Sequence, residues 1–178
     1  MNPFTYDQLP ARIVFGAGRL AEVGGEVERL GGRHVMLISD GAATAAASAI
    51  TGQLGSRLAV AWNEVAQHVP AELAERARTA ATEASIDCVV CVGGGSSTGL
   101  AKALALSHAV PILAVPTTYA GSEQTAIYGL TGGRRKETGK NAIVQPKTVV
   151  YDPELTLGLP AFITGPSAFN ALAHSVEQ

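Results

Sequence analysis

A strand, a run of glycines and a helix follow one another near the middle of the chain, and this order constrains the fold more than any other feature. The apolar run 86–92 predicts a buried strand, and 98–106 predicts the opening of a helix. Between them lies Gly93-Gly94-Gly95-Ser96-Ser97. Glycines let a backbone approach a ligand closely, and N–H groups at a helix N-terminus attract phosphate. We therefore expect backbone N–H groups and the two serine hydroxyls to cradle a pyrophosphate, rather than an ordinary tight turn.

Strands and helices alternate over most of the chain. Strands are expected at 12–15, 34–39, 58–62, 86–92, 109–115 and 148–151, and helices at 19–30, 44–54, 70–85 and from residue 98. This alternation predicts an α/β fold with a Rossmann-like, mostly parallel sheet flanked by helices. The polar region 121–145 is expected to form a hairpin or a long loop.

The end of the chain predicts a second unit. Asp152-Pro153 marks a boundary, and a helix is expected to begin at Pro166 and to be still continuing at Gln178. A length of 178 residues accommodates one domain and the beginning of another. We expect a dinucleotide-binding α/β domain over 1–154 and the start of an all-helical C-terminal domain over 155–178, with the rest of that domain missing.

Composition and charge exclude several classes of partner. Hydrophobic residues make up 47% of the chain, enough for a sizeable core. A net charge of −2 provides no attraction to nucleic acid or to an anionic membrane. The N-terminus lacks the pattern of a signal peptide, and prolines break the longest uncharged stretch, 103–122. These features predict a cytoplasmic protein that binds neither nucleic acid nor membrane.

Four groups of polar or sulfur-bearing residues are candidates for chemistry. Cys88 and Cys91 fall on opposite faces of a strand, which favours buried filler over redox or zinc chemistry. Asp40 ends a strand, where its carboxylate can bind ribose and repel the 2′-phosphate of NADP, or equally can cap the next helix. The remaining groups are the hydroxyl-rich Thr117-Thr118-Tyr119 after the strand 109–115, and Asn170 with His174, which are four apart on one helix face.

Three segments and a short motif carry a resemblance to a known family. They are GGGSSTGLAKALAL, VPTTYAGSEQT and TGKNAIVQPKTVVYDPELTLGLP, followed by NALAH. They resemble the iron-containing alcohol dehydrogenase superfamily, and within it the maleylacetate reductase branch. Members are longer chains in which a dinucleotide-binding α/β domain precedes an all-helical domain, and the active site lies in the cleft between the two. Relatives are commonly homodimers.

The resemblance implies a function. Members of that branch use NADH or NADPH to reduce the C=C bond of maleylacetate, a small dicarboxylate, to 3-oxoadipate in the breakdown of aromatic compounds. We expect NADH as the cofactor, on the strength of Asp40, with NADPH as the alternative. The other functions considered are a metal-dependent alcohol dehydrogenase and a non-catalytic nucleotide-binding fragment. Residues 1–178 alone are expected to bind the cofactor weakly and to show no turnover.

The cofactor residues carry over position by position. The pyrophosphate turn is matched by Gly94, Gly95, Ser96 and Ser97, the acidic position near the adenosine ribose by Asp40, and the loop lining the cofactor cleft by Thr117, Thr118 and Tyr119. By its distance from Pro146, Lys136 falls where metal-dependent relatives place a lysine near the nicotinamide ribose, and Lys140 is the alternative.

The resemblance also bears on substrate and metal. His174 is expected to contact the substrate or supply a proton, with Asn170 as its neutral hydrogen-bond partner. Many relatives have Asp in place of Gly99, and the metal-using members have Asp in place of Asn170, whereas maleylacetate reductases share both departures and are understood to work without a metal. Two further histidine ligands would lie beyond Gln178, so we expect no metal.

Overall fold

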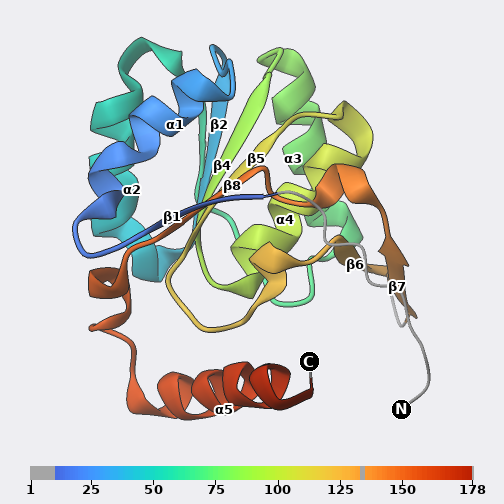
Figure 1. Cartoon of the computed structure of the whole chain (residues 1–178). Coiled ribbons are helices and arrows are strands. Elements are labelled where there is room, and N and C mark those ends of the chain that lie inside the picture. Colours follow the sequence, from blue (N-terminus) through green and yellow to red (C-terminus); the bar gives the residue numbers. More distant parts are fainter. Residues whose placement is uncertain (1–10, 133–134, 178) are drawn as a thin grey trace, which may run out of the picture.

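The computed structural model describes residues 11–132 and 135–177 (Figure 1). In these residues the central element is a six-stranded parallel sheet in the order β1-β8-β5-β4-β2-β3. Its strands are β1 (Arg12–Phe15), β2 (Val35–Ser39), β3 (Leu58–Trp62), β4 (Cys88–Gly93), β5 (Ile112–Pro116) and β8 (Thr148–Tyr151). The predicted α/β fold with a Rossmann-like sheet is confirmed.

Helices cover both faces of this sheet in the described part of the chain (Figure 1). One face is packed by α1 (Val23–Arg29) and α2 (Thr44–Leu54), and the other by α3 (Ala71–Glu83) and α4 (Gly95–His108). Successive residues of β4 alternate between the two apolar cores, because strand side chains point to opposite faces. Cys88 therefore belongs to the core beneath α1 and α2, and Cys91 to the core beneath α3 and α4, as predicted.

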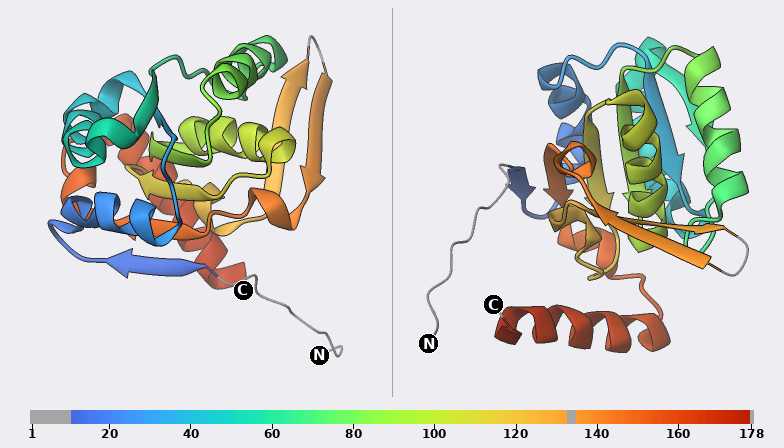
Figure 2. Two further views of the ribbon diagram at one scale, coloured as in Figure 1. Left: turned by 90° about the horizontal axis from the view of Figure 1, so that it is seen from above. Right: turned by 90° about the vertical axis from the view of Figure 1, so that its right-hand side faces the viewer.

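Two further units lie beside these layers. The hairpin expected within 121–145 is formed by β6 (Ile127–Gly132) and β7 (Arg135–Lys140), which pair antiparallel and lie beside α4 (Figure 2). The last helix, α5 (Ala161–Glu177), runs apart from the α/β layers in Figure 1 and in the right-hand view of Figure 2, and it is hydrogen-bonded to the loop after β5. No helix in residues 11–132 and 135–177 is long and apolar enough to cross a membrane.

Two helices begin differently from the predictions. The N-cap of α4 is Gly94, and the helix starts at Gly95 rather than Thr98, because the Thr98 N–H donates to the Gly94 carbonyl at 3.3 Å. The helix expected over 19–30 opens with a 3-10 turn, η1 (Arg19–Glu22), before α1. Such turns are frequent at helix N-termini. The serines of the glycine-rich run therefore belong to the first turn of α4.

The start of α5 also differs. Pro166, expected as the beginning of this helix, lies inside it, five residues after Ala161. The Pro160 carbonyl accepts the N–H groups of Ile163 and Thr164, both at 2.9 Å, and so begins the helix earlier. Proline has no N–H to offer the carbonyl four residues before it, at Phe162. That residue is largely exposed, so water can reach the region of the unpaired carbonyl.

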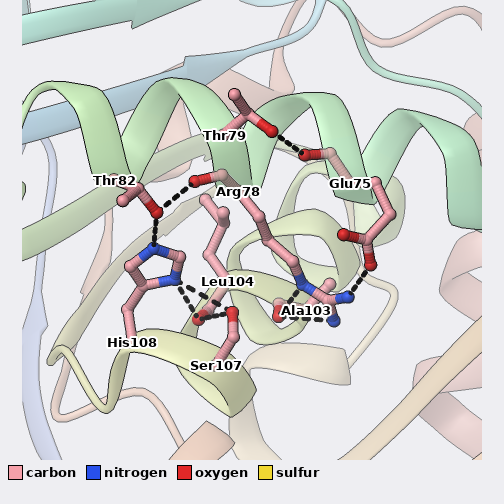
Figure 3. A network of polar contacts seen from close by, with 8 residues as sticks. All are labelled: Glu75, Arg78, Thr79, Thr82, Ala103, Leu104, Ser107 and His108. Carbon is pink, nitrogen blue, oxygen red and sulfur yellow. Dashed lines mark hydrogen bonds and ion pairs between the residues drawn. The ribbon is translucent and has the colours of Figure 1, made fainter.

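The far end of α4 is fastened to α3 by a polar network (Figure 3). The guanidinium of Arg78 donates to the Ala103 carbonyl from Nε at 3.3 Å and from Nη2 at 3.1 Å. Thr82 Oγ1 lies 3.0 Å from His108 Nε2. These contacts bind a carbonyl and a side chain in the last two turns of α4. The helix that begins at the glycine-rich turn is therefore fixed at its opposite end.

Candidate functional site

The direction of the sheet reverses between β2 and β4. From β2 the chain continues to β3 on one side, and from β4 it continues through α4 to β5 on the other side. In open α/β sheets, ligands bind in the crevice outside the carboxyl ends of the strands at such a reversal. Asp40 follows β2 and Gly94 follows β4, so both lie at this point.

The N-terminus of α4 presents free amides to this crevice. Within the described residues, the N–H groups of Gly95, Ser96 and Ser97 have no hydrogen-bond partner, as the first N–H groups of a helix do. Gly93 allows the Asp40 carboxylate to approach the turn closely. Its φ is +142°, and a Cβ at this position would lie 2.3 Å from Asp40 Oδ2. An anion at this helix end would receive three N–H donors and the positive end of the helix dipole.

Asp40 joins the two strand ends. Its Oδ1 accepts from the N–H groups of Ala42 at 3.1 Å and Ala43 at 3.0 Å, which is the capping that the sequence left open. Its Oδ2 accepts the Gly94 N–H at 3.1 Å. The Gly94 amide, expected to face a pyrophosphate, is thus already bound by Asp40. The cradle consists of the three amides that follow.

The two serines differ in their surroundings. Ser97 is buried, and its hydroxyl lies 3.5 Å from Asp40 Oδ2, so it faces the protein rather than the crevice. Ser96 is partly exposed. Of the two hydroxyls expected at a pyrophosphate, Ser96 is the accessible one.

The loop after β5 forms the wall of the crevice opposite Asp40. The Thr117 N–H donates to the Gly93 carbonyl at 3.0 Å, which ties this loop to the glycine-rich turn. A Cβ on Gly94 would lie 3.3 Å from Thr118 Cγ2, so Thr118 is directly beside the turn. Tyr119 faces α5, where its N–H donates to Ser167 Oγ at 2.8 Å. The three predicted loop residues therefore connect the cradle to the last helix.

A first cavity of about 660 Å³ lies between the strand ends and α5. Its walls include Phe15, Pro116 and Tyr151 from the ends of β1, β5 and β8, and Ala171 and Ser175 from α5. The volume is in the range of small-molecule sites. The strand ends, the loop and α5 together enclose a space next to the glycine-rich turn, because Thr118 borders both.

Asn170 and His174 lie on α5, one turn apart. Asn170 Nδ2 donates to the Ala120 carbonyl at 3.4 Å, which fastens the helix to the loop. The His174 side chain lies outside the described side chains. Asn170 itself lines neither cavity, but its neighbour Ala171 lines the first cavity and its partner Ala120 lines the second.

A second cavity of about 270 Å³ lies between the same loop and the β6–β7 hairpin. Thr138 lines it, and so does Ile127, which pairs with Lys140. Thr131, which pairs with Lys136, is not in its wall. The side chain of Lys136 lies outside the described ones, but the register places position 140 nearer this cavity than position 136.

Two polar groups in this region were not predicted from the sequence. The Tyr151 hydroxyl donates to Glu123 Oε1 at 2.7 Å and accepts from Gln124 Nε2 at 2.8 Å, and burial raises the pKa of Tyr151. Lys102, in the middle of α4, is completely buried, and desolvation lowers its pKa to about 8. The available signal for Lys102 was a single charge within an otherwise apolar helical stretch. Glu123 and Tyr151 lie far apart in the sequence and gave no such signal.

The described residues contain no group of three or more His, Cys, Asp or Glu side chains placed to hold a metal ion. Burial raises the pKa of the Cys88 and Cys91 thiols to about 12, so neither provides a thiolate ligand near neutral pH. The Asn170 amide is bound to the Ala120 carbonyl and carries no charge. The described residues therefore do not fit a metal site by themselves.

The parallel sheet, the reversal point and the free amides at the start of α4 define a Rossmann-like fold. Residues 10–153 match the iron-containing alcohol dehydrogenase family. The chain belongs to that family.

One named relative and two solved structures show which members of the family this chain is similar to. The chain is 48% identical over 177 residues to maleylacetate reductase of Burkholderia cepacia, covering 99% of this chain and 50% of that one. The crystal structure of maleylacetate reductase from Rhizobium sp. strain MTP-10005 is 45% identical, with a TM-score of 0.93, over 99% of this chain and 51% of that one. The crystal structure of an iron-containing alcohol dehydrogenase from Corynebacterium glutamicum is 46% identical, with a TM-score of 0.88. The match covers 99% of this chain and 49% of that one. The chain thus spans about half the length of the relatives it matches.

Proposed function

We propose that the full-length protein is a maleylacetate reductase and that residues 1–178 provide its cofactor-binding half. The observation that carries this proposal is the 48% identity to the Burkholderia cepacia maleylacetate reductase over nearly the whole chain. The departures at Gly99 and Asn170 support it, because they resemble that branch rather than the metal-using members.

NADH is the cofactor we assign, with NADPH as the alternative. The unpaired amides of Gly95, Ser96 and Ser97 fit a pyrophosphate, because they converge at one helix end. The Asp40 carboxylate lies beside the same turn, and we assign it to the ribose hydroxyls, where its charge would repel a 2′-phosphate. When bound, the cofactor supplies the hydride for the reduction. The protein's contribution is to orient it.

The remaining chemistry is charge stabilisation and one proton transfer. Hydride addition to the alkene carbon remote from the ketone moves the electron pair into the enolate of that ketone. Donors at the ketone oxygen would stabilise this enolate, and protonation of the adjacent carbon gives 3-oxoadipate. We assign His174 to substrate contact or proton supply, with Asn170 as its neutral partner. Cations for the two substrate carboxylates would come from the helical domain.

The organisation of the longer protein remains a proposal. We infer a division into 1–154 and the start of a helical domain over 155–178. The apolar side chains that α5 exposes support further chain packing on this helix, among them Phe162 and Phe169. A homodimer is inferred from the resemblance, and light scattering of the full-length protein would test it.

We also infer that the reaction needs no metal. The family is named for iron, so membership does not support this inference. Its support is the neutral amide at Asn170, a weaker metal donor than a carboxylate. Metal analysis of active full-length protein tests it, and activity that disappears with bound iron or zinc and returns with it would contradict the inference.

The function is tested by assaying the full-length protein with maleylacetate and each cofactor, and with simple alcohols and NAD. We expect maleylacetate-dependent oxidation of NADH, slower oxidation of NADPH and negligible alcohol turnover. The alcohol arm is included because similar structures are named as alcohol dehydrogenases. Efficient alcohol oxidation without maleylacetate reduction would overturn the proposal.

A further inference from the structure

Lys102 reaches from the middle of α4 to the loop that separates the two cavities. Its side chain is completely buried. Its Nζ donates to the carbonyl oxygens of Ser122, Thr125 and Ile127, each at 2.7 Å, and lies 3.1 Å from Thr125 Oγ1. An ammonium has three donors and no acceptor, so three converging carbonyls match it.

The burial of this charge is not explained by packing. Among the described residues Lys102 forms no ion pair. The nearby Glu123 carboxylate accepts the Tyr151 hydroxyl instead. Burying an ammonium is unfavourable, whereas an apolar side chain of similar length would fill the same space without that cost. The residue type therefore points to a need for a cation at these three carbonyls.

The segment 122–127 that Lys102 holds belongs to the walls of both cavities. Ser122, Thr125 and Ile127, whose carbonyls bind the ammonium, line the second cavity. Glu123 and Gln124, which lie between them, line the first cavity and hold the Tyr151 hydroxyl. A displacement of this segment would thus change both spaces at once.

The free amides of Gly95, Ser96 and Ser97 and the Lys102 ammonium, which anchors the 122–127 segment, belong to the same helix, α4. Lys102 lies seven residues after Gly95, which is two helical turns and about 10 Å along α4. We propose that Lys102 is a positioning residue, which holds the 122–127 segment and thereby both cavity walls at a fixed place relative to the amide cradle. Its effect on catalysis rests on the proposed function; its effect on the segment does not.

The test compares Lys102→Met with Leu104→Ala in the full-length protein. Leu104 is buried in the same helix and packs in the apolar core, so its truncation destabilises α4 without touching the anchor. Calorimetry with NADH reports the number of sites and the Kd separately, and hydrogen exchange reports the 122–127 amides. We expect Lys102→Met to raise the Kd for NADH about tenfold at the sites that remain competent. Hydrogen exchange of the 122–127 amides should become faster, and kcat/KM for maleylacetate should fall.

A merely structural role would give a different result. It would lower the number of competent sites in both variants and leave the Kd of the remaining sites unchanged. That outcome, or slow exchange of 122–127 in Lys102→Met, would overturn the proposal. If Lys102→Met does not fold, fast exchange of 122–127 in the wild-type protein would overturn it. Absence of maleylacetate turnover in the wild type would contradict the proposed function alone, because exchange and NADH binding are measured independently.

Discussion

The Asp40 carboxylate and the Gly94 amide connect the ends of two neighbouring strands through a hydrogen bond of 3.1 Å. The same carboxylate caps the 3-10 turn η2 (Gly41–Ala43) that follows β2. Asp40 therefore both caps the 3-10 turn and shapes the glycine-rich turn, and its proposed contact with a ribose would come in addition to these two roles. A residue that does both should affect cofactor binding more than an ordinary cap does.

Asp40→Asn tests this relationship. The amide keeps an oxygen for the cap, but its nitrogen cannot accept the Gly94 N–H or a ribose hydroxyl. We expect NADH affinity of the full-length protein to fall about tenfold, the value of one charged hydrogen bond, and NADPH affinity to fall less. Calorimetry with both cofactors measures the change. The matched control is Asp87→Asn, because Asp87 binds the N–H groups of Arg33 and His34 away from the crevice. Equal loss in both variants would contradict the role of Asp40.

Gly99 and Val69 are matched in shape. A Cβ on Gly99 would lie 2.8 Å from Val69 Cγ2, and Val69 is buried with a φ of +47°. Gly99→Ala should therefore lower the free energy of unfolding by about 1–3 kcal/mol through overpacking. Val69→Ala in the same chain should recover part of that loss, since it removes the opposing methyl groups. Urea unfolding of the two single variants and the double variant measures the coupling, and additive losses would contradict the contact.

Two matched variants distinguish the roles of the two lysines of β7, Lys136 and Lys140. The register places Lys140 opposite Ile127 in the wall of the second cavity, and Lys136 opposite Thr131 farther along the hairpin. If this cavity takes part of the cofactor, Lys140→Met should weaken NADH binding about tenfold and Lys136→Met should have little effect. The opposite order would return the assignment to Lys136. Kd values from NADH fluorescence decide between them.

The two cysteines should be chemically silent in the folded protein. Burial raises both thiol pKa values to about 12, so almost no thiolate forms at pH 8 and no reagent reaches it. We expect labelling by a thiol reagent at pH 8 only after denaturant is added. Unfolded thiols titrate near pH 9, so these groups stabilise the fold fully below pH 9 and lose that contribution as the pH rises toward 12. Rapid labelling of the native protein would instead support a redox function.

Elements whose signals are local were predictable from the sequence. The bounds of α2 and β3 agree with the predictions, because apolar spacing and flanking glycines mark them. The start of α5 was missed because Pro166 has the form of a first-turn proline, whereas the Pro160 carbonyl begins the helix. The contacts that organise the site join distant residues, such as Asp40 to Gly94 and Lys102 to Ile127. Periodicity and propensity carry no information about such pairs.

The most direct test of the proposed reduction follows the hydride itself. Full-length protein is given maleylacetate and NADH carrying deuterium at the transferred position, and the product is examined by NMR. Reduction of the C=C bond predicts 3-oxoadipate with deuterium on the former alkene carbon remote from the ketone. Deuterium on a newly formed carbinol carbon would mean that the ketone is reduced, as in an alcohol dehydrogenase, and would contradict the proposed function.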